Sequence, residues 1–177
     1  ETFTGESFHP LNPTQGSIWI EDIAHHLSNQ CRFSGATRVH YSVAEHSVRV
    51  SLLLKEWGED EDVQFWGLLH DASEAYLVDL PTPLKQNSQI GEIYRVAEKR
   101  LMREICARFS MNEVQPDRVT FADAVLLATE VRDLMPARTA HWEKLMVRPH
   151  TSVIVPWSQK DAEAVFLSRF HALDGGR

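Results

Sequence analysis

The chain has 177 residues with ordinary apolar and charged fractions, which fits one domain large enough to bury a hydrophobic core. The formal net charge of −7, without a basic stripe, argues against a nucleic-acid duplex or an anionic membrane as the main partner. A small anionic substrate stays open, because local Arg and Lys side chains can outweigh the global charge at close range.

The first third of the chain predicts an arm followed by two helices. Residues 1–18 are rich in Pro, Gly, Thr and Asn, so we expect an extended arm. A short helix is expected over 21–28, and an irregular loop over 31–41. A second helix is expected from Ser42 to Trp57, because Ser42 and an acidic residue three positions later form a capping box. Its apolar stripe includes His46, which we therefore place on the buried face.

The middle of the chain predicts a helix that carries three ionisable side chains. After an acidic turn, apolar residues follow the helical period, and the helix is expected to end near Val78. On one helix, His70 and Glu74 would lie one turn apart, with Asp71 on the same edge. The two prolines within 79–85 argue against regular helix in that segment.

The last third predicts three more helices and one short strand. A long helix is expected over about 90–109, and another from about 116 to 134. Residues 121–128 of the latter are apolar except for Asp123, so we expect a helix buried nearly all round whose carboxylate needs a strong partner. Residues 137–152 look irregular, 152–155 predict a strand, and a final helix is expected over 158–173. We therefore expect a single all-α domain over 1–177.

The two cysteines and the chain start indicate a compartment. Cys31 and Cys106 lack metal-ligand spacing relative to each other and are expected to be reduced thiols. The start has no basic segment followed by an apolar run, so no secretory leader is expected. No apolar stretch approaches the roughly 18 residues that span a bilayer. We expect a soluble, cytoplasmic protein without a membrane partner.

Four residues share the chemistry of a metal site: His46, His70, Asp71 and Asp123. Each lies in a segment otherwise suited to burial, where a polar side chain is costly unless it is paired or metal-bound. Two imidazoles and two carboxylates suit a divalent ion such as Zn, Mn, Co, Ni or Fe. The alternative is that each is an ordinary core or surface residue, since a His-Asp pair alone also arises by chance.

The order His, His-Asp, Asp on successive helices resembles the HD-domain phosphohydrolase superfamily. Within it, the chain is similar to the bacterial 5′-deoxynucleotidases and to the compact phage dATP triphosphohydrolases. This resemblance covers residues 30–134 best and implies an all-α HD-domain bundle of about six to eight helices, with at most a minor β-hairpin. It is carried by the strings AEHS at 44–47, LHDASEA at 69–75, DLPTPLK at 79–85 and ADA at 122–124.

The resemblance implies a role for each residue of the predicted centre. His46, His70, Asp71 and Asp123 would hold one divalent metal ion, with Mg added to the ions named above. Such an ion lowers the pKa of a bound water and neutralises charge on a phosphoryl oxygen. Glu74 would take the proton from the attacking water, and Asp71 would belong to the catalytic group as well as to the ligands.

The resemblance also implies a set of substrate contacts. Arg32 and Lys85 would clamp the phosphate, and Asp79 would accept a hydrogen bond from the 3′-hydroxyl. Phe33 stands where the deoxynucleotidases usually have a Trp that packs on the sugar and excludes a 2′-hydroxyl. Phe is smaller and cannot donate a hydrogen bond, so the selectivity for deoxyribose stays open.

Other interpretations of these residues are kept beside the functional ones. Glu74 could be a surface carboxylate of its helix, and Arg32 and Lys85 could be solvated surface charges. Arg38 and His40 are the best additional candidates for phosphate contact, because they lie in the loop before the predicted helix that carries His46.

Three functions are compatible with the sequence. The first is a 5′-deoxynucleotidase that releases the nucleoside from a deoxynucleoside monophosphate. The second is a dNTP triphosphohydrolase that releases triphosphate, and the third is a non-catalytic HD module that binds a nucleotide as a sensor. By analogy we also expect a homo-oligomer, for which Trp19, Trp142 and Trp157 offer candidate interface side chains.

Overall fold

A computed structural model describes residues 1–136, 142 and 146–175. In this part of the chain all regular elements are helices, and β-structure is limited to one isolated antiparallel bridge between Cys31 and Ser42. The predicted all-α class is confirmed. Among the described helices, none is both long and apolar enough to cross a membrane.

Helices α1, α2, α6, α7 and α8 correspond to helices expected from the sequence, whereas η2, α4 and α5 are short elements that the sequence analysis did not predict. The elements are η1 Gln15–Ser17, α1 Ile20–Asn29, η2 Arg32–Gly35, α2 Val43–Glu56, α3 Glu61–Leu69, α4 Glu74–Leu77, α5 Thr82–Asn87, α6 Gln89–Arg108, α7 Asp117–Leu134 and α8 Gln159–Asp174.

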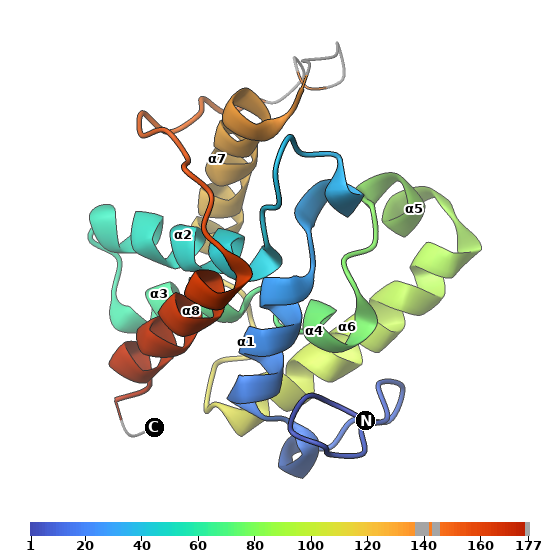
Figure 1. The fold of residues 1–177 in the computed structure, drawn as a ribbon. Helices are drawn as coiled ribbons and strands as arrows, with labels where there is room; N and C mark the ends of the chain where they lie inside the picture. The colour runs from blue at the N-terminus through green and yellow to red at the C-terminus, as the bar shows by residue number, and fades with distance from the viewer. Residues whose placement is uncertain (137–141, 143–145, 176–177) are drawn as a thin grey trace.

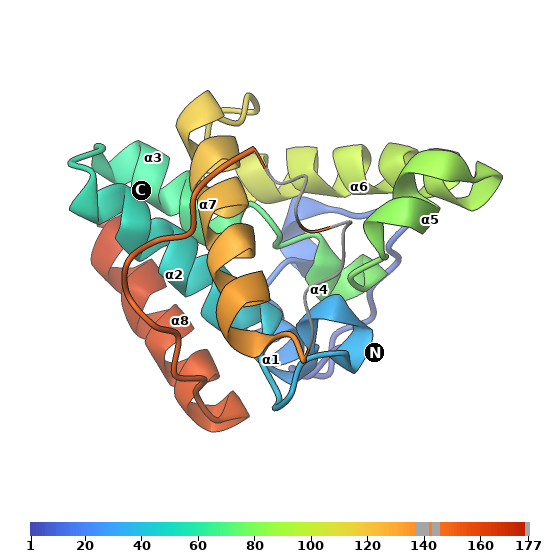
Figure 2. The same ribbon diagram turned by 90° about the horizontal axis from the view of Figure 1, so that it is seen from above.

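Helix α2 is the central element of the bundle. It packs against α1, α3, α7 and α8, while α5 and the start of α6 lie to one side of the bundle in both ribbon views (Figure 1, Figure 2). Val43 and Val48 face the apolar cluster shared with α1, α3 and α8, and Val50 and Leu54 face a second cluster shared with α7. His46 lies between these positions in the sequence of α2 and is fully buried, as the apolar stripe predicts.

The N-terminus of α2 confirms one half of the predicted capping box. The Ser42 hydroxyl accepts a hydrogen bond from the Glu45 amide at 3.1 Å, which satisfies one backbone donor of the first turn. The Glu45 carboxylate is instead bonded to Arg49 at 2.7 Å and to the Trp157 amide at 2.8 Å. It therefore fastens the segment before α8 to α2.

The predicted helix through Val78 is wrong, because α3 ends at Leu69 and a tightened turn follows. The amides of Ala72 and Glu74 bond the carbonyls three residues back, at 2.9 Å each, instead of four residues back. His70 and Glu74 are thus not on successive turns of one helix. The tightened turn brings the side chains of the neighbouring His70 and Asp71 together, with Nε2 of His70 3.2 Å from Oδ2 of Asp71.

The prediction that 79–85 contains no regular helix is also wrong. Helix α5 begins at Thr82, with Pro83 in its first turn. The first turn of a helix leaves its amides without intrahelical partners, so a proline there costs no hydrogen bond. The prolines therefore start a helix in this segment rather than prevent one.

The predicted strand over 152–155 is absent from the described residues. Its backbone groups are bonded to side chains instead of to a second strand. The Ile154 amide donates to the Asp133 carboxylate at 2.9 Å, and the Val155 carbonyl accepts from Arg49 at 3.0 Å. The segment is consequently an extended connection that runs along α7 and α2.

Helix α7 is less buried than the apolar run predicts. Its inner face is buried, but Phe121 is 46% exposed and lies against Trp57, with the ring centroids 5.5 Å apart. An apolar run of this length therefore does not place every side chain in the core. The exposed side near Asp123 borders the cavity described below.

Candidate metal centre

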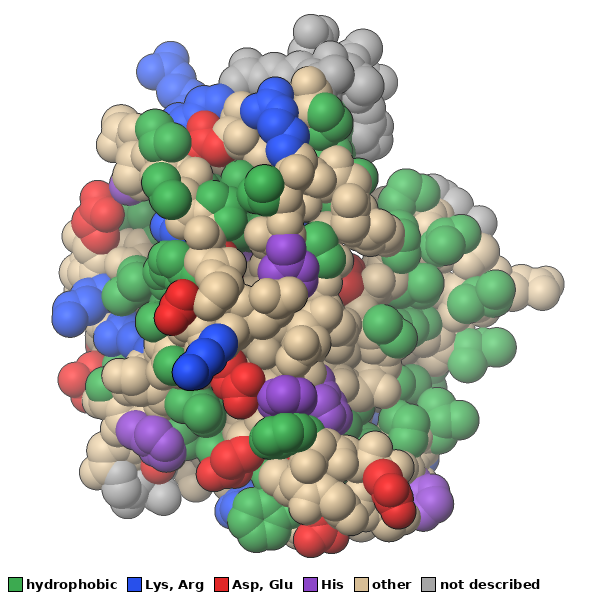
Figure 3. Space-filling model, viewed as in Figure 1, with side chains coloured by type: hydrophobic (Ala, Val, Ile, Leu, Met, Phe, Trp, Pro, Cys, Tyr) green, Lys and Arg blue, Asp and Glu red, His purple; other side chains and the backbone are tan. Residues whose placement is uncertain are grey.

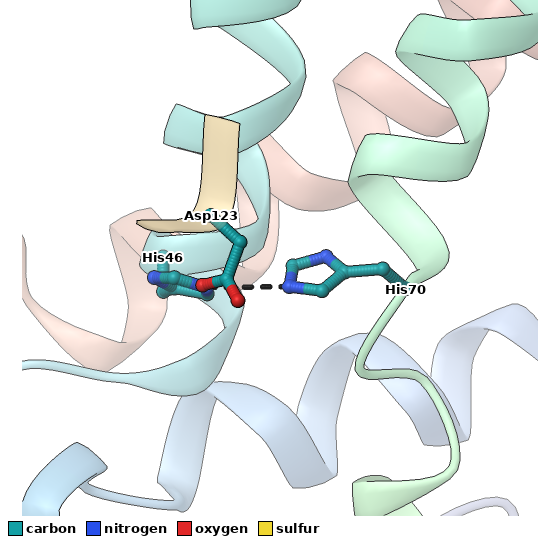
Figure 4. A group of neighbouring side chains, drawn as sticks. All are labelled: His46, His70 and Asp123. Atoms are coloured by element: carbon teal, nitrogen blue, oxygen red, sulfur yellow. Dashed lines mark hydrogen bonds and ion pairs between the residues drawn. The ribbon is translucent and has the colours of Figure 1, made fainter. Parts of the chain in front are cut away.

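Four side chains from three parts of the chain converge at the middle of the molecule. His46 comes from α2, His70 and Asp71 come from the turn after α3, and Asp123 comes from the first half of α7. Figure 4 shows His46, His70 and Asp123 pointing toward one another, and their donor atoms all lie within 4.8 Å of one another. The Oδ2 atom of Asp71 lies 3.2 Å from Nε2 of His70 and 3.7 Å from Nε2 of His46.

The second nitrogen of each imidazole is already hydrogen-bonded outside the cluster. Nδ1 of His70 lies 2.8 Å from the Gly67 carbonyl, which can only accept, so Nδ1 is the donor. Nδ1 of His46 lies 2.6 Å from a carboxylate oxygen of Glu130 and is also a donor. Such bonds fix the tautomer in which Nε2 carries a lone pair available to a metal.

These two Nε2 atoms lie only 3.3 Å apart, and Nε2 of His46 is 3.2 Å from Oδ1 of Asp123. In the fixed tautomers, lone pairs of two imidazoles and two carboxylates face one small volume. A cation relieves their repulsion, and the N₂O₂ donor set suits a divalent ion of intermediate hardness. The residues present therefore fit a metal ion.

The neighbouring carboxylates raise the pKa of both imidazoles. Burial lowers the pKa of His70, but the Asp71 and Asp123 carboxylates outweigh burial and raise it to about 9. Burial and Arg32 lower the pKa of His46, but Glu130 and Asp123 leave it above its ordinary value. The same negative field that retains these protons attracts a metal ion.

The carboxylates are shifted in the opposite direction. Burial favours the neutral acid of Asp71, yet the two imidazoles and Arg32 hold its pKa well below the usual range. The pKa of Asp123 is likewise lowered, against burial, by His46 and His70. Both groups are therefore in the ionised form that binds metals.

A cavity of about 790 Å³ opens beside the cluster, a size typical of pockets for small ligands. Its wall includes Asp71 and Asp123 of the metal cluster and every other predicted catalytic or substrate residue: Arg32, Phe33, Glu74, Asp79 and Lys85. The structure thus brings together residues that the sequence analysis assigned to one site. Arg38 and His40 are not part of this wall; they bond the backbone carbonyls of other residues.

Glu74 lies in the cavity wall with only 5% of its surface exposed. Its Oε1 is 3.7 Å from Nζ of Lys85, and within the described chain its buried Oε2 has no hydrogen-bond partner. Burial and the neighbouring Asp71 and Asp79 raise its pKa well above the ordinary value. A buried carboxylate with a free oxygen and a raised pKa has the properties of a general base.

The two predicted phosphate clamps are held by carboxylates. Nη1 of Arg32 is 3.5 Å from Asp71, and Nε is 3.2 Å from Glu130. Nζ of Lys85 is 2.6 Å from Glu98. Each cation is therefore positioned at the cavity by its partners rather than solvated at the surface.

The segment that follows Arg32 has an unusual backbone. Phe33 and Ser34 have φ values of 55° and 51°, and Gly35 follows with 80°. Residues with side chains rarely adopt this left-handed region, and they do so where the surroundings require it. Here the turn places Phe33 in the cavity wall, edge-on to Trp142 with the ring centroids 6.0 Å apart.

Sequence reasoning missed Glu130, which is fully buried on α7 and contacts both His46 and Arg32. The available sign was its position seven residues after Asp123, which places both on one face of the helix two turns apart. It also missed Gln30, whose side-chain amide joins α4 to the next segment. Nε2 of Gln30 donates to the Glu74 carbonyl at 2.9 Å, and Oε1 accepts from the Asp79 amide at 3.2 Å.

Comparison with known proteins shows the family to which the chain belongs. The family model of the HD domain matches residues 43–143, which contain His46, His70, Asp71 and Asp123. The chain is 35% identical to the uncharacterized protein YfdR of Escherichia coli (strain K12) over 175 residues, covering 98% of this chain and 94% of that protein. It is 31% identical to an uncharacterized protein of Rhodobacter capsulatus over 183 residues, covering 96% of this chain and 92% of that protein.

Proposed function

The chain belongs to the HD-domain family of metal-dependent phosphohydrolases, and we propose that it hydrolyses the 5′-phosphate ester of deoxynucleoside monophosphates. One observation carries the proposal. The predicted base, phosphate clamps and sugar-binding residues line the same cavity as the metal ligands Asp71 and Asp123. This arrangement supports hydrolysis of a phosphate that enters the cavity and reaches the metal centre.

In the proposed reaction, His46, His70, Asp71 and Asp123 hold the divalent ion. When bound, that ion supplies charge neutralisation for the phosphoryl group and lowers the pKa of a bound water. Glu74 accepts the proton of the attacking water at its unbonded Oε2. The other predicted residues of the cavity wall bind the substrate.

Arg32 and Lys85 bind the phosphate oxygens, and both cations are pre-positioned by carboxylates, so little ordering is needed when the substrate arrives. Asp79 accepts a hydrogen bond from the 3′-hydroxyl of the sugar. Gln30 supports this contact, because its side chain ties the Asp79 amide to α4. Phe33 packs against the sugar and base side of the nucleotide.

The charges of the described wall residues support a monophosphate over a triphosphate. Among the lining residues that the structure describes, the cations are Arg32 and Lys85, and each already faces a carboxylate. A triphosphate carries more negative charge than these two groups balance. The cavity volume nevertheless accommodates a dNTP, so the release of triphosphate is kept as the alternative that the assay below separates.

A non-catalytic nucleotide sensor is a weaker alternative. A sensor needs the metal ligands and the clamps but has no use for a general base. Glu74 is buried at a cost, with an oxygen that no described group satisfies. The presence of such a carboxylate in the wall supports catalysis.

The test is an assay of the purified protein with Mn, Co, Mg, Zn, Ni or Fe and a panel of ribo- and deoxynucleoside mono- and triphosphates. We expect a deoxynucleoside and inorganic phosphate as products, separated by chromatography, and loss of activity in His70→Ala and Asp71→Ala. Release of triphosphate selects the alternative. Absence of turnover on every nucleotide, with nucleotide binding unchanged in both variants, overturns the catalytic proposal.

Glu74→Gln separates catalysis from metal binding. The amide keeps the shape of the side chain but cannot take a proton, so kcat should fall about 10²–10⁴-fold, the usual range for a general base. Metal affinity, measured by calorimetry, should stay near that of the wild-type protein, since Glu74 is outside the predicted ligand set. A loss of affinity equal to that of His70→Ala would place Glu74 among the ligands instead.

Oligomerisation and location complete the proposal. We expect a homo-oligomer, and exposed apolar side chains on α6 support it: Ile90, Ile93 and Val96 are 67%, 69% and 72% exposed. Figure 3 shows hydrophobic side chains gathered over α5 and α6. Analytical ultracentrifugation measures the oligomeric state directly.

The free thiols of Cys31 and Cys106 support a reducing, cytoplasmic location.

A further inference from the structure

Glu130 on α7 is a buried carboxylate that the proposed reaction does not use. None of its surface is exposed and it does not line the cavity, so it cannot touch a substrate. Both of its oxygens are nevertheless bonded to groups of the site. We infer that Glu130 is a positioning residue that orients the metal ligand His46 and the phosphate clamp Arg32 together. The part concerning Arg32 rests on the proposed function.

The first contact fixes a metal ligand. Oε1 of Glu130 accepts from Nδ1 of His46 at 2.6 Å, a short charge-assisted hydrogen bond. It sets the rotation of the ring and keeps the lone pair on Nε2, the atom that faces His70 and Asp123. A carboxylate in this position also makes the imidazole a stronger ligand, because it stabilises the partial positive charge that coordination creates.

The second contact fixes the clamp. Oε2 of Glu130 accepts from Nε of Arg32 at 3.2 Å, on the inner side of the guanidinium. The Arg32 side chain is only 12% exposed, and Nη1 lies 3.5 Å from Asp71. Burying this cation would be costly without a carboxylate beside it. Glu130 therefore holds the guanidinium at the place where it lines the cavity.

The two contacts use one rigid element. Asp123 and Glu130 are seven residues apart on α7, so one face of one helix supplies both a direct ligand and the support of another ligand. The carboxylate charge of Glu130 is shared by His46 and Arg32. Occupation of the metal site and binding of a phosphate should therefore depend on the same side chain.

The competing interpretation is that Glu130 only neutralises Arg32 in the core. That role predicts a loss of stability without an effect on metal affinity in the folded protein. The substitution Glu130→Gln distinguishes the two, because Gln preserves the size of the side chain but removes the charge. Glu45→Gln is the matched control: Glu45 is also fully buried, and it bonds Arg49 and the Trp157 amide outside the site.

The experiment measures Co²⁺ and Mn²⁺ affinity by calorimetry on the full chain without a substrate, after circular dichroism has shown that each variant is folded. We expect Glu130→Gln to bind the ions about 10–100-fold more weakly than the wild-type protein, the range found when partners of metal-ligating histidines are lost. Glu45→Gln should retain wild-type affinity. With inorganic phosphate as a competitive inhibitor, Glu130→Gln should also show a raised inhibition constant.

A wild-type measurement tests the inference even where the variant fails to fold. In the Zn²⁺-loaded protein, nitrogen and proton NMR should detect a slowly exchanging, far-downfield Nδ1–H proton on His46. A His46 ring protonated on Nε2, wild-type metal affinity in a folded Glu130→Gln, or equal losses in Glu130→Gln and Glu45→Gln would each overturn it. A wild-type protein that binds none of Co²⁺, Mn²⁺ and Zn²⁺ would also overturn the inference. Metal affinity needs no turnover, so a protein that binds metal but hydrolyses no nucleotide overturns the proposed function, and with it the role of Arg32 as a phosphate clamp, but not the positioning of His46 by Glu130.

Discussion

At His70, a proton and a metal ion compete for the same nitrogen. The pKa of this imidazole is raised to about 9, above the ordinary value of about 6.5. Below pH 9 an incoming metal ion therefore has to displace a proton, so we predict that metal affinity is lowest in acid and rises with pH until about 9. One displaced proton changes the affinity about tenfold per pH unit, and the raised pKa of His46 adds to this slope.

Calorimetry in buffers of different ionisation enthalpy measures both the slope and the protons released. The folding stability of the metal-free protein should have the opposite pH dependence: it should fall as the pH rises. A group whose pKa is raised by folding contributes stability below its unfolded pKa, and that contribution is lost as the pH rises through about 9. Metal affinity independent of pH between 6.5 and 9 would contradict the assignment of His70 Nε2 as a ligand.

The sequence contained enough information to predict candidate metal ligands but not the residues that support them. His46, His70 and Asp123 are conspicuous because polar side chains in apolar segments need partners. Glu130 lacks this signal, because Thr129, Arg132 and Asp133 around it are also polar. Its partners His46 and Arg32 are distant in the chain, and only the fold brings them to it. The contacts of Gln30 could not be predicted for the same reason.

At the scale of elements, the site depends on the close crossing of α2 and α3 at Gly67. A Cβ atom there would meet the Leu54 side chain and lie 3.3 Å from the Cα atom of Ser51. The Gly67 carbonyl is also the acceptor that orients His70. The packing of two helices and the direction of one imidazole are thus set at the same residue.

We predict that Gly67→Ala lowers the free energy of unfolding by roughly 1–3 kcal/mol, the usual cost of an overfilled core position. The displaced α3 should also weaken metal binding, because the His70 ring moves with its carbonyl partner. Urea denaturation and metal titration measure the two effects. Gly16→Ala is the control, since a Cβ atom at Gly16 meets nothing within 4 Å. Equal stability of the two variants would show that the crossing tolerates a methyl group.

Helix positions were predictable where an apolar stripe and a cap coincide, as in α2 and α8. The break after Leu69 was not, because the apolar period continues across it while the hydrogen bonds shift to partners three residues back. Helix α5 was missed because Pro81 is its N-cap and Pro83 lies in its first turn, where the rule against proline does not apply. Local patterns therefore predict long elements better than the short turns that complete the site.

At the scale of the whole molecule, the predicted ligands join α2, the turn after α3, and α7. An ion bound to all three stabilises the folded chain, because the unfolded chain has no assembled site. At a free metal concentration about 100-fold above Kd, the stabilisation is about 2.7 kcal/mol. For a domain of this size, that predicts a rise in Tm of roughly 5–10 °C.

Differential scanning calorimetry with Mn²⁺, before and after chelation, measures this shift. His70→Ala should bind the ion weakly and lose most of the rise in Tm. The same increase in both proteins would indicate stabilisation by ions bound elsewhere on the acidic surface. The net charge of −7 makes this comparison necessary.

The left-handed turn at Phe33, Ser34 and Gly35 has a consequence for protein engineering. A design procedure that optimises backbone conformation alone would replace Phe33 and Ser34 with glycine, since glycine adopts such φ values with the least strain. The redesigned chain would keep its helices and core but lose the aromatic ring from the cavity wall. Thermostabilisation of this protein should therefore leave these two positions untouched and seek its gains elsewhere.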